Sequence, residues 1–191
     1  MLFNRDKIIL DLCGGTGSWS KPYLDAGYDV RLITLPKQDV IDYIHPDNVY
    51  GILGAPPCEM FSIARQTAKT PRDFIKAMGP VNACIRIAYT AKPKFFALEN
   101  PGFGKLIHWL GQPRYKFHPW HFGDARSKST GLWGVFNKPV KLFNDIRDVM
   151  NNNEIELSKR NSLPLSGNGS WKERRALTPP GFAKAFFKAN Q

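Results

Sequence analysis

Short apolar runs alternate with longer mixed segments through residues 1–110, and this alternation constrains the fold more than any other feature. It is typical of strand–helix–strand units built around a parallel sheet. The runs that read as buried strands cover residues 7–12, 28–35, 49–53 and 94–99. Apolar residues at helical spacing predict helices over residues 19–26 and 73–91, the second with a kink or restart at Gly79-Pro80. We therefore expect an α/β fold with a mostly parallel sheet flanked by helices.

The texture changes beyond residue 110, where Pro, Gly, aromatic and basic residues interleave. One strand is expected at residues 130–135. The polar residues 136–175 read as loop-like. An amphipathic helix is expected at residues 179–190, with Phe182, Ala185 and Phe186 on one side. No linker separates two parts, so residues 1–191 read as a single domain, a length at which folding buries about 70% of the chain's surface.

The chain is strongly basic, with a formal net charge of +11. Residues 1–95 carry 12 basic and 9 acidic groups, whereas residues 96–191 carry 15 and 7. A basic second half favours nucleic acid as a partner. No apolar run reaches the roughly 18 residues of a membrane span, and the N-terminus lacks a secretory signal, so we expect a cytoplasmic protein with no membrane partner.

Three widely spaced cysteines fit a reducing compartment rather than a disulfide framework. No metal site is expected: Cys-x-x-Cys pairs are absent, and His118 and His121 have no thiolate or carboxylate cluster beside them in the sequence. We interpret these two histidines as surface or groove residues.

A glycine-rich turn, Gly14-Gly15-Thr16-Gly17, directly follows the first expected strand. Glycine lets a ligand approach the backbone closely, and the next helix presents unpaired N–H groups, so such a turn suits a nucleotide-like cofactor. The turn lacks the Gly-Lys-Ser/Thr of a phosphate-binding Walker loop and the third glycine of the dinucleotide fingerprint. Tight packing alone would also explain it.

Two further groups stand at the carboxyl ends of expected strands, where α/β sheets bind their ligands. Pro56-Pro57 holds Cys58 on a rigid backbone, which suits a nucleophile. Glu99, followed by Asn100-Pro101, ends the apolar run of residues 95–98, and burial there would raise its pKa, as a proton donor needs. A lone cysteine would more often be structural, and a lone glutamate a cap or ion pair. Their combination favours catalysis.

These segments together resemble the DNA cytosine-C5 methyltransferases. The resemblance rests on Asp11–Gly17, Gly54–Ser62 and Glu99–Pro101, which match in order that family's cofactor loop, nucleophile loop and proton-donor motif. Phe122-Gly123 followed by Arg126-x-Lys128 is similar to a later motif of the family. The resemblance implies a Rossmann-like, S-adenosylmethionine-dependent fold. Short chains of this type resemble phage- or prophage-encoded members.

The resemblance also assigns roles. Cys58 would attack C6 of a flipped-out cytosine while Glu99 protonates or hydrogen-bonds N3, after which C5 takes the methyl group. It implies these site residues: catalytic Cys58, Glu99 and Lys128; cofactor-binding Asp11, Cys13, Gly14, Gly15, Thr16, Gly17, Asp39 and Pro56; substrate-binding Pro57, Ser62, Asn100, Pro101 and Arg126. For Asp39, a plain helix N-cap before residues 40–44 is an equally good interpretation.

The chain departs from the family pattern at several positions. The family usually has Phe at Cys13, a carboxylate at the end of the second strand near Thr34, Gln at Glu59, and arginines at Lys128 and Thr130. Residues 136–175 stand as a reduced remnant where members carry a long target-recognition domain. We therefore expect weak sequence specificity on DNA, or specificity supplied by a protein partner. The basic stretch 114–128, together with Lys172, Arg174 and Arg175, is expected to grip phosphates and stack bases.

Two other functions remain open on the sequence. One is C5 modification of a nucleotide or RNA. The other is a degenerate, non-catalytic relative that binds nucleic acid or S-adenosylmethionine. The departures at Cys13, Thr34 and Thr130 favour the non-catalytic function, and the intact Cys58 and Glu99 oppose it.

Overall fold

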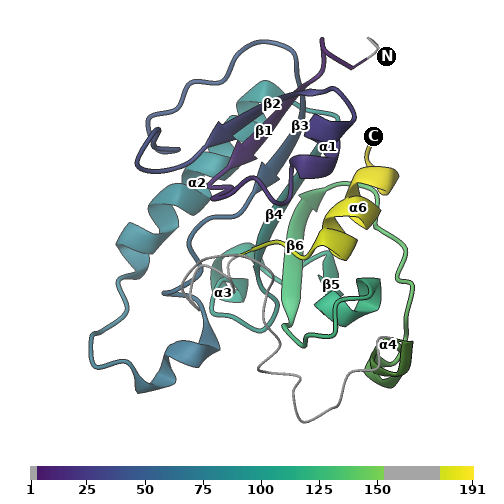
Figure 1. The fold of residues 1–191 in the computed structure, drawn as a ribbon. Helices are drawn as coiled ribbons and strands as arrows, with labels where there is room; N and C mark the ends of the chain where they lie inside the picture. The colour runs from purple at the N-terminus through teal and green to yellow at the C-terminus, as the bar shows by residue number, and fades with distance from the viewer. Residues whose placement is uncertain (1–3, 153–176) are drawn as a thin grey trace.

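Six strands form one mixed sheet. They are β1 (Ile8–Leu12), β2 (Asp29–Ile33), β3 (Val49–Gly54), β4 (Phe95–Pro101), β5 (Tyr115–Phe117) and β6 (Thr130–Val135). The strand order is β2-β1-β3-β4-β6-β5, and the first four are parallel. β6 runs antiparallel to both β4 and β5. The computed structural model describes residues 4–152 and 177–191 (Figure 1).

The helices are α1 (Lys21–Asp25), α2 (Phe74–Ala91), α3 (Ile107–Leu110), α4 (Ile146–Asn152) and α6 (Pro180–Ala189), with 3-10 turns η1 (Ile63–Thr67) and η2 (Pro119–Phe122). Asp73 caps α2, because its carboxylate accepts the backbone N–H of Lys76 at 2.9 Å. The helix continues through Gly79-Pro80 without a restart. Gly27, in the left-handed region at φ +83°, follows the end of α1 as a helix-ending glycine should.

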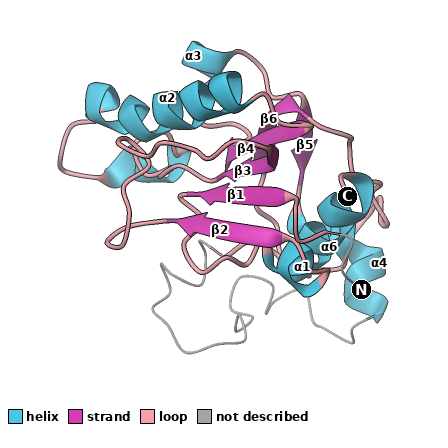
Figure 2. Cartoon of the chain, turned by 90° about the horizontal axis from the view of Figure 1, so that it is seen from above, coloured by secondary structure: helices cyan, strands magenta, loops and turns pink. Residues whose placement is uncertain are grey.

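Two hydrophobic cores cover the two faces of the sheet, since side chains alternate along each strand. Leu10 and Ile52 point to the face covered by α2, whereas Ile9 and Leu53 point to the face covered by α1 and α6. Figure 2 shows α2 and α3 on one side of the sheet and α1 and α6 on the other.

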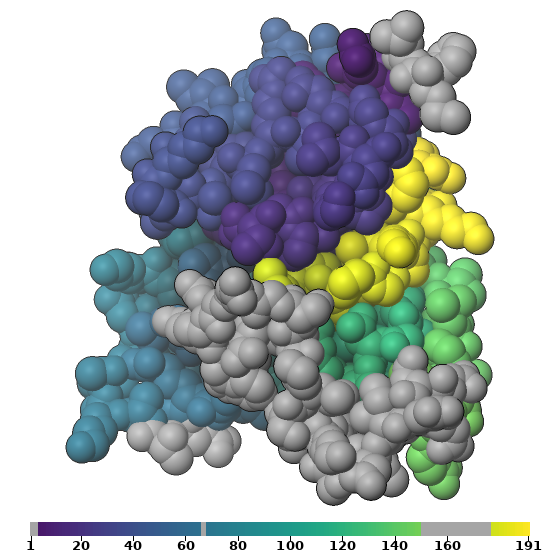
Figure 3. Space-filling model, in the orientation of Figure 1, coloured from purple at the N-terminus to yellow at the C-terminus, as the bar shows by residue number. Residues whose placement is uncertain are grey.

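The C-terminal helix joins distant parts of the chain. In Figure 3 its yellow surface lies between the purple N-terminal residues and the green and teal residues of the second half. The approach is close: a Cβ at Gly181 would lie 2.0 Å from the carbonyl oxygen of Phe122, so only glycine fits there. The helix therefore holds the η2 region against the sheet.

Phe182 is the aromatic anchor of this helix and gives a stability prediction. Its side chain is fully buried and its ring stacks on Phe117 at a centroid distance of 4.0 Å. We expect Phe182→Ala to lower the free energy of unfolding by about 3–5 kcal/mol, because a large cavity is left behind. Urea unfolding measures this loss, with the exposed Lys184→Ala as the control within about 0.5 kcal/mol of the parent. A loss below about 1 kcal/mol would contradict the packing described.

The α/β expectation is confirmed, and the expected strands and long helices are present with ends shifted by a few residues. Three differences stand out. The sheet is mixed; β5 was missed, because three residues in an aromatic stretch carry no strand pattern; and residues 146–152, expected as loop, form α4. Val149 of α4 is buried against Ala125, a contact that the polar local sequence does not reveal. Residues 153–175 of the expected loop-like segment lie outside the described residues.

Candidate active site

The loops that follow β1 and β3 leave the sheet where its strand order reverses. β2 lies on one side of β1 and β3 on the other, so this is the switch point at which open α/β sheets bind ligands. The backbone N–H of Ala55 donates to the carbonyl of Leu12 at 2.9 Å, which ties the two strand ends together. One loop carries the glycine turn, and the other carries Cys58.

Cys58, Glu99 and Lys128 form an interacting group at the carboxyl ends of β3 and β4. The Nζ atom of Lys128 lies 3.5 Å from Oε1 of Glu99. Burial raises the pKa of the Cys58 thiol, the negative charge of Glu99 raises it further, and the positive charge of Lys128 lowers it. β6 pairs with β4 so that Thr130 faces Pro101, which brings Lys128 to the end of β4. Long-range pairing thus assembles the three predicted catalytic side chains.

A small pocket opens beside Glu99 and Lys128. Phe117 and Thr130 line it from the sheet, and Leu177, Thr178, Pro179 and Phe182 line it from the start of the C-terminal helix. The backbone N–H of Thr178 donates to the hydroxyl of Ser18 at 3.0 Å, so this segment is tied to the region after the glycine turn. The C-terminal segment therefore forms one wall of the candidate site.

Asp11 stands at the base of the glycine turn and is completely buried. Its Oδ2 accepts a hydrogen bond from the Ser20 hydroxyl at 2.5 Å, whereas its Oδ1 has no partner among the described residues. A Cβ at Gly14 would lie 2.2 Å from that Oδ1, so glycine is required there. Gly15 and Thr16 are exposed, and the Gly17 N–H closes the turn onto the Gly14 carbonyl at 2.9 Å. A buried acceptor beneath an open backbone turn suits a ligand that donates hydrogen bonds.

Burial raises the pKa of Asp11 to about 6, against the hydrogen bonds from Ser20, which lower it. The folded protein therefore holds this proton more tightly than the unfolded chain, in which the carboxyl has its ordinary pKa of 3.8. The resulting stabilisation is complete below about pH 4 and is lost as the pH rises through about 6, a change of about 3 kcal/mol. We expect Asp11→Asn to remove this slope in urea unfolding measured from pH 4 to 7. Parallel stability curves for the two proteins would contradict it.

Asn100 connects the ends of β3 and β4. Its Nδ2 donates to the carbonyl of Pro56 at 3.1 Å, and its side chain is fully buried with Oδ1 unpartnered among the described residues. Pro56 is buried and Pro57 exposed. Asn100 thus holds the backbone that precedes Cys58, and Pro101 continues β4 to its last pair with Thr130.

Cys13 lies in the left-handed region at φ +57° and packs against Cys84 of α2. The Cys84 thiol donates a hydrogen bond to Cys13 that lowers the pKa of Cys13, while burial and the charges of Asp39 and Asp11 raise it. Asp39 therefore lies near the glycine turn. Residues 40–44 are irregular, so the N-cap interpretation of Asp39 is wrong; its Oδ1 accepts the Ile41 N–H at 3.0 Å in a local turn.

Several predicted binding residues make local contacts. The Ser62 hydroxyl caps η1 by accepting the Ala64 N–H, and Arg126 pairs with Asp124 at 4.0 Å. His121 is buried rather than a surface or groove residue: its Nδ1 accepts the backbone N–H of His118 at 2.8 Å.

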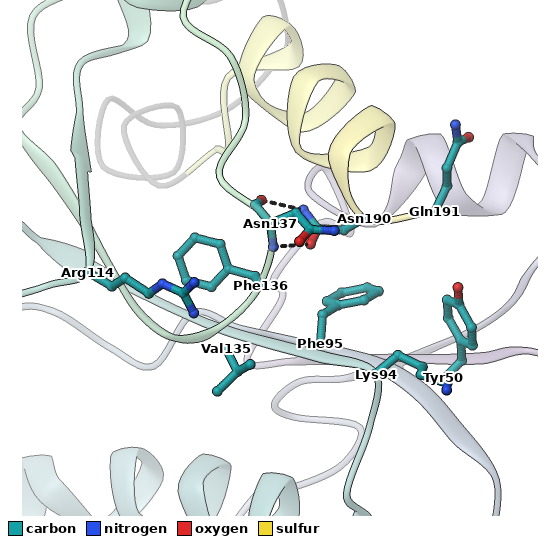
Figure 4. Close-up of a pocket in the computed structure, with 9 residues that line it drawn as sticks. All are labelled: Tyr50, Lys94, Phe95, Arg114, Val135, Phe136, Asn137, Asn190 and Gln191. Carbon is teal, nitrogen blue, oxygen red and sulfur yellow. Dashed lines mark hydrogen bonds between the residues drawn. The ribbon is translucent and has the colours of Figure 1, made fainter.

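A second pocket, of about 190 Å³, lies at the opposite ends of the strands from Cys58, by the amino ends of β3 and β4 (Figure 4). Arg114 lines it, with its guanidinium over the Phe136 ring at 5.5 Å, and Asn137 and Asn190 exchange hydrogen bonds beside it. Arg114 and Lys128 therefore line different pockets, at opposite ends of the strands.

Sequence reasoning missed three supporting residues: Ser20, Thr178 and Arg72. Ser20 directly precedes α1, and a serine before a helix was a usable signal for a buried hydroxyl near the glycine turn. Thr178 and Arg72 carried no local sequence signal. Thr178 bonds to Ser18, and Arg72 bonds to the carbonyls of Met60 and Ser62, so both roles depend on contacts between separate segments.

Comparison with family models and with curated proteins finds no match to this chain. Among the described residues, no group of three or more His, Cys, Asp or Glu side chains is arranged to hold a metal ion. No helix in the described part of the chain is long and apolar enough to span a membrane.

Proposed function

We propose that this chain is a compact S-adenosylmethionine-dependent DNA cytosine-C5 methyltransferase with a Rossmann-like fold. The observation that carries the proposal is the grouping of Cys58, Glu99 and Lys128 beside the glycine turn at the switch point of the sheet. A nucleophile, a proton donor and a cation in one place suit addition to an electron-poor ring.

The residues around the glycine turn fit the cofactor. The unpartnered, buried Oδ1 of Asp11 is an acceptor for an ammonium group such as that of S-adenosylmethionine. Gly15 leaves the backbone bare for close approach, because nothing lies within 4 Å of the place a Cβ would take, and Asp39 lies near Cys13 as a carboxylate for the adenine amino group. The end of β2 carries Ile33 and Thr34 in place of a carboxylate for the ribose hydroxyls, which weakens cofactor affinity.

The chemistry follows from the charges at the site. A thiolate at Cys58 and a carboxylate at Glu99 repel each other, so a proton on Glu99 favours the thiolate. Cys58 forms a bond to C6 of cytosine while Glu99 gives its proton to N3, and Lys128 stabilises the negative charge of the pair. S-adenosylmethionine supplies the methyl group that C5 accepts. A water molecule then takes the C5 proton, and the electron pair of that bond forms the C5–C6 double bond as the C6–sulfur bond breaks, which frees Cys58 as a thiolate. N3 returns its proton to Glu99.

We propose low sequence specificity on DNA, or specificity from a protein partner. Direct readout needs several side chains held rigidly against base edges. Between β6 and α6, the described residues contribute one short helix, α4, and its buried Val149 packs inward on Ala125. The net charge of +11 favours binding to the phosphate backbone, which is independent of sequence.

Transfer of a labelled methyl group from S-adenosylmethionine tests the proposal. DNA duplexes, single strands, RNA and cytidine nucleotides are compared, and Cys58→Ser is the matched control. We expect label in DNA with the parent protein and none with Cys58→Ser. Label in RNA or nucleotides instead supports the alternative substrates. Calorimetric binding of S-adenosylmethionine without transfer to any substrate supports the non-catalytic alternative.

A further inference from the structure

Backbone hydrogen bonds hold the turn that carries Cys58. The Cys58 carbonyl accepts the N–H groups of Phe61 and Ser62 at 3.0 and 2.8 Å, and the Phe61 carbonyl accepts the N–H of Lys105 at 2.7 Å. Phe61 is fully buried and packs against both Phe74 and Trp109, whose rings also contact each other. The turn is thus anchored at its centre.

Arg72 adds two hydrogen bonds to this turn. One guanidinium nitrogen donates to the Met60 carbonyl, and the other donates to the Ser62 carbonyl at 2.9 Å. Arg72 directly precedes Asp73, the cap of α2, so its backbone stands at the end of a helix that is buried through Val81 and Cys84. A planar guanidinium, held just before the N-cap of a packed helix, therefore bonds to the carbonyls of Met60 and Ser62 in the turn after the nucleophile.

We propose that Arg72 is a positioning residue that fixes the turn of residues 58–62 and thereby aims the Cys58 thiol at Glu99 and Lys128. Arg72 acts through the backbone, because its guanidinium nitrogens donate to main-chain carbonyls of the turn. The planar guanidinium matches two carbonyls at once, which a lysine ammonium cannot do with the same geometry. A misplacement of about 1 Å at a reacting centre costs about 100-fold in rate.

The test compares the parent with Arg72→Ala, Arg72→Lys and Lys76→Ala. Lys76 is an exposed cation on the first turn of α2, so its variant removes one charge without touching the turn. The primary readout is the rate of Cys58 alkylation by iodoacetamide against pH, followed by mass spectrometry of the Cys58 peptide. It does not depend on methyl transfer. The second readout is the split between kcat and KM in transfer.

In Arg72→Ala we expect faster alkylation of Cys58 and a lower apparent thiol pKa, because the thiol leaves its half-buried position near Glu99. We expect kcat to fall by about 100-fold with the KM for S-adenosylmethionine within about threefold of the parent. In both the alkylation rate and kcat, Arg72→Lys should lie between Arg72→Ala and the parent, and Lys76→Ala should match the parent. If Arg72→Ala does not fold, the alkylation profile of Arg72→Lys decides.

Alkylation profiles of both Arg72 variants that match the parent would overturn the proposal. The turnover readout rests on the proposed function, and the alkylation readout does not. If the Arg72 variants shift the alkylation profile and the parent protein transfers no methyl group, the positioning role is supported and the proposed methyltransferase function is overturned.

Discussion

Replacing Glu99 with Gln is expected to lower methyl transfer by about 100- to 10,000-fold, the usual contribution of a positioned acid or base. The same change should make Cys58 more acidic, because the negative charge of Glu99 raises the pKa of that thiol. Activity and thiol acidity therefore move in opposite directions. Labelled methyl transfer measures the first, and alkylation of Cys58 against pH measures the second.

Lys128→Met is expected to change the pKa of the Cys58 thiol in the opposite direction to Glu99→Gln. The positive charge of Lys128 lowers the pKa of Cys58, so its removal should make the thiol less acidic. Lys128 and Glu99 form an ion pair at 3.5 Å, and their side chains are 36% and 20% exposed. Lys128→Met and Glu99→Gln should therefore each lower the free energy of unfolding by at most about 1 kcal/mol. Thiol pKa changes of the same sign in both variants would show that the group does not interact as described.

Replacing Gly14 with Ala is expected to weaken binding of S-adenosylmethionine by about 5- to 100-fold. The new Cβ would lie 2.2 Å from Oδ1 and 2.3 Å from Cγ of Asp11, a carboxylate that is buried and bonded to Ser20. The turn must move to relieve the overlap, and overpacking of this kind costs about 1–3 kcal/mol. Titration calorimetry with S-adenosylmethionine measures the change in Kd.

Gly79→Ala is the control for this variant. Gly79 lies inside α2, and a Cβ there would meet only Ile41 Cδ1 at an ordinary 3.5 Å. Ala is also the better helix former, so this variant should bind as the parent does and unfold no more readily. If Gly14→Ala binds S-adenosylmethionine as tightly as the parent does, the glycine turn is not part of the cofactor site.

The strands β1, β3 and β4 were predictable because each is a short, largely buried apolar run that ends at or just before Gly or Pro, and burial on both faces leaves little freedom for such runs. Placing Cys58 and Glu99 at the same edge of the sheet followed from parallel strands alone. The strand β6 was expected, but its antiparallel pairing with β4, which brings Lys128 to Glu99, could not be read from local pattern, since it joins residues 29 to 39 positions apart.

The contacts that hold the site were harder to predict. Arg72 reaches back to carbonyls 10 and 12 residues earlier, and no spacing rule marks such a contact. The interpretation of Asp39 as a helix cap was wrong because residues 40–44 pack as an irregular loop on α2, where Arg86 donates to the carbonyls of Ile41 and Tyr43. A local sequence signal was overridden there by packing against a distant helix.

The most direct test of the central claim is a covalent trap at Cys58. The protein is mixed with S-adenosylmethionine and DNA that contains 5-fluorocytosine, whose fluorine blocks the final loss from C5, and the digested complex is examined by mass spectrometry. We predict a stable adduct of the methylated fluorocytosine on the Cys58 peptide and none in Cys58→Ser. An adduct that persists in Cys58→Ser, or no adduct with any DNA, would contradict the account.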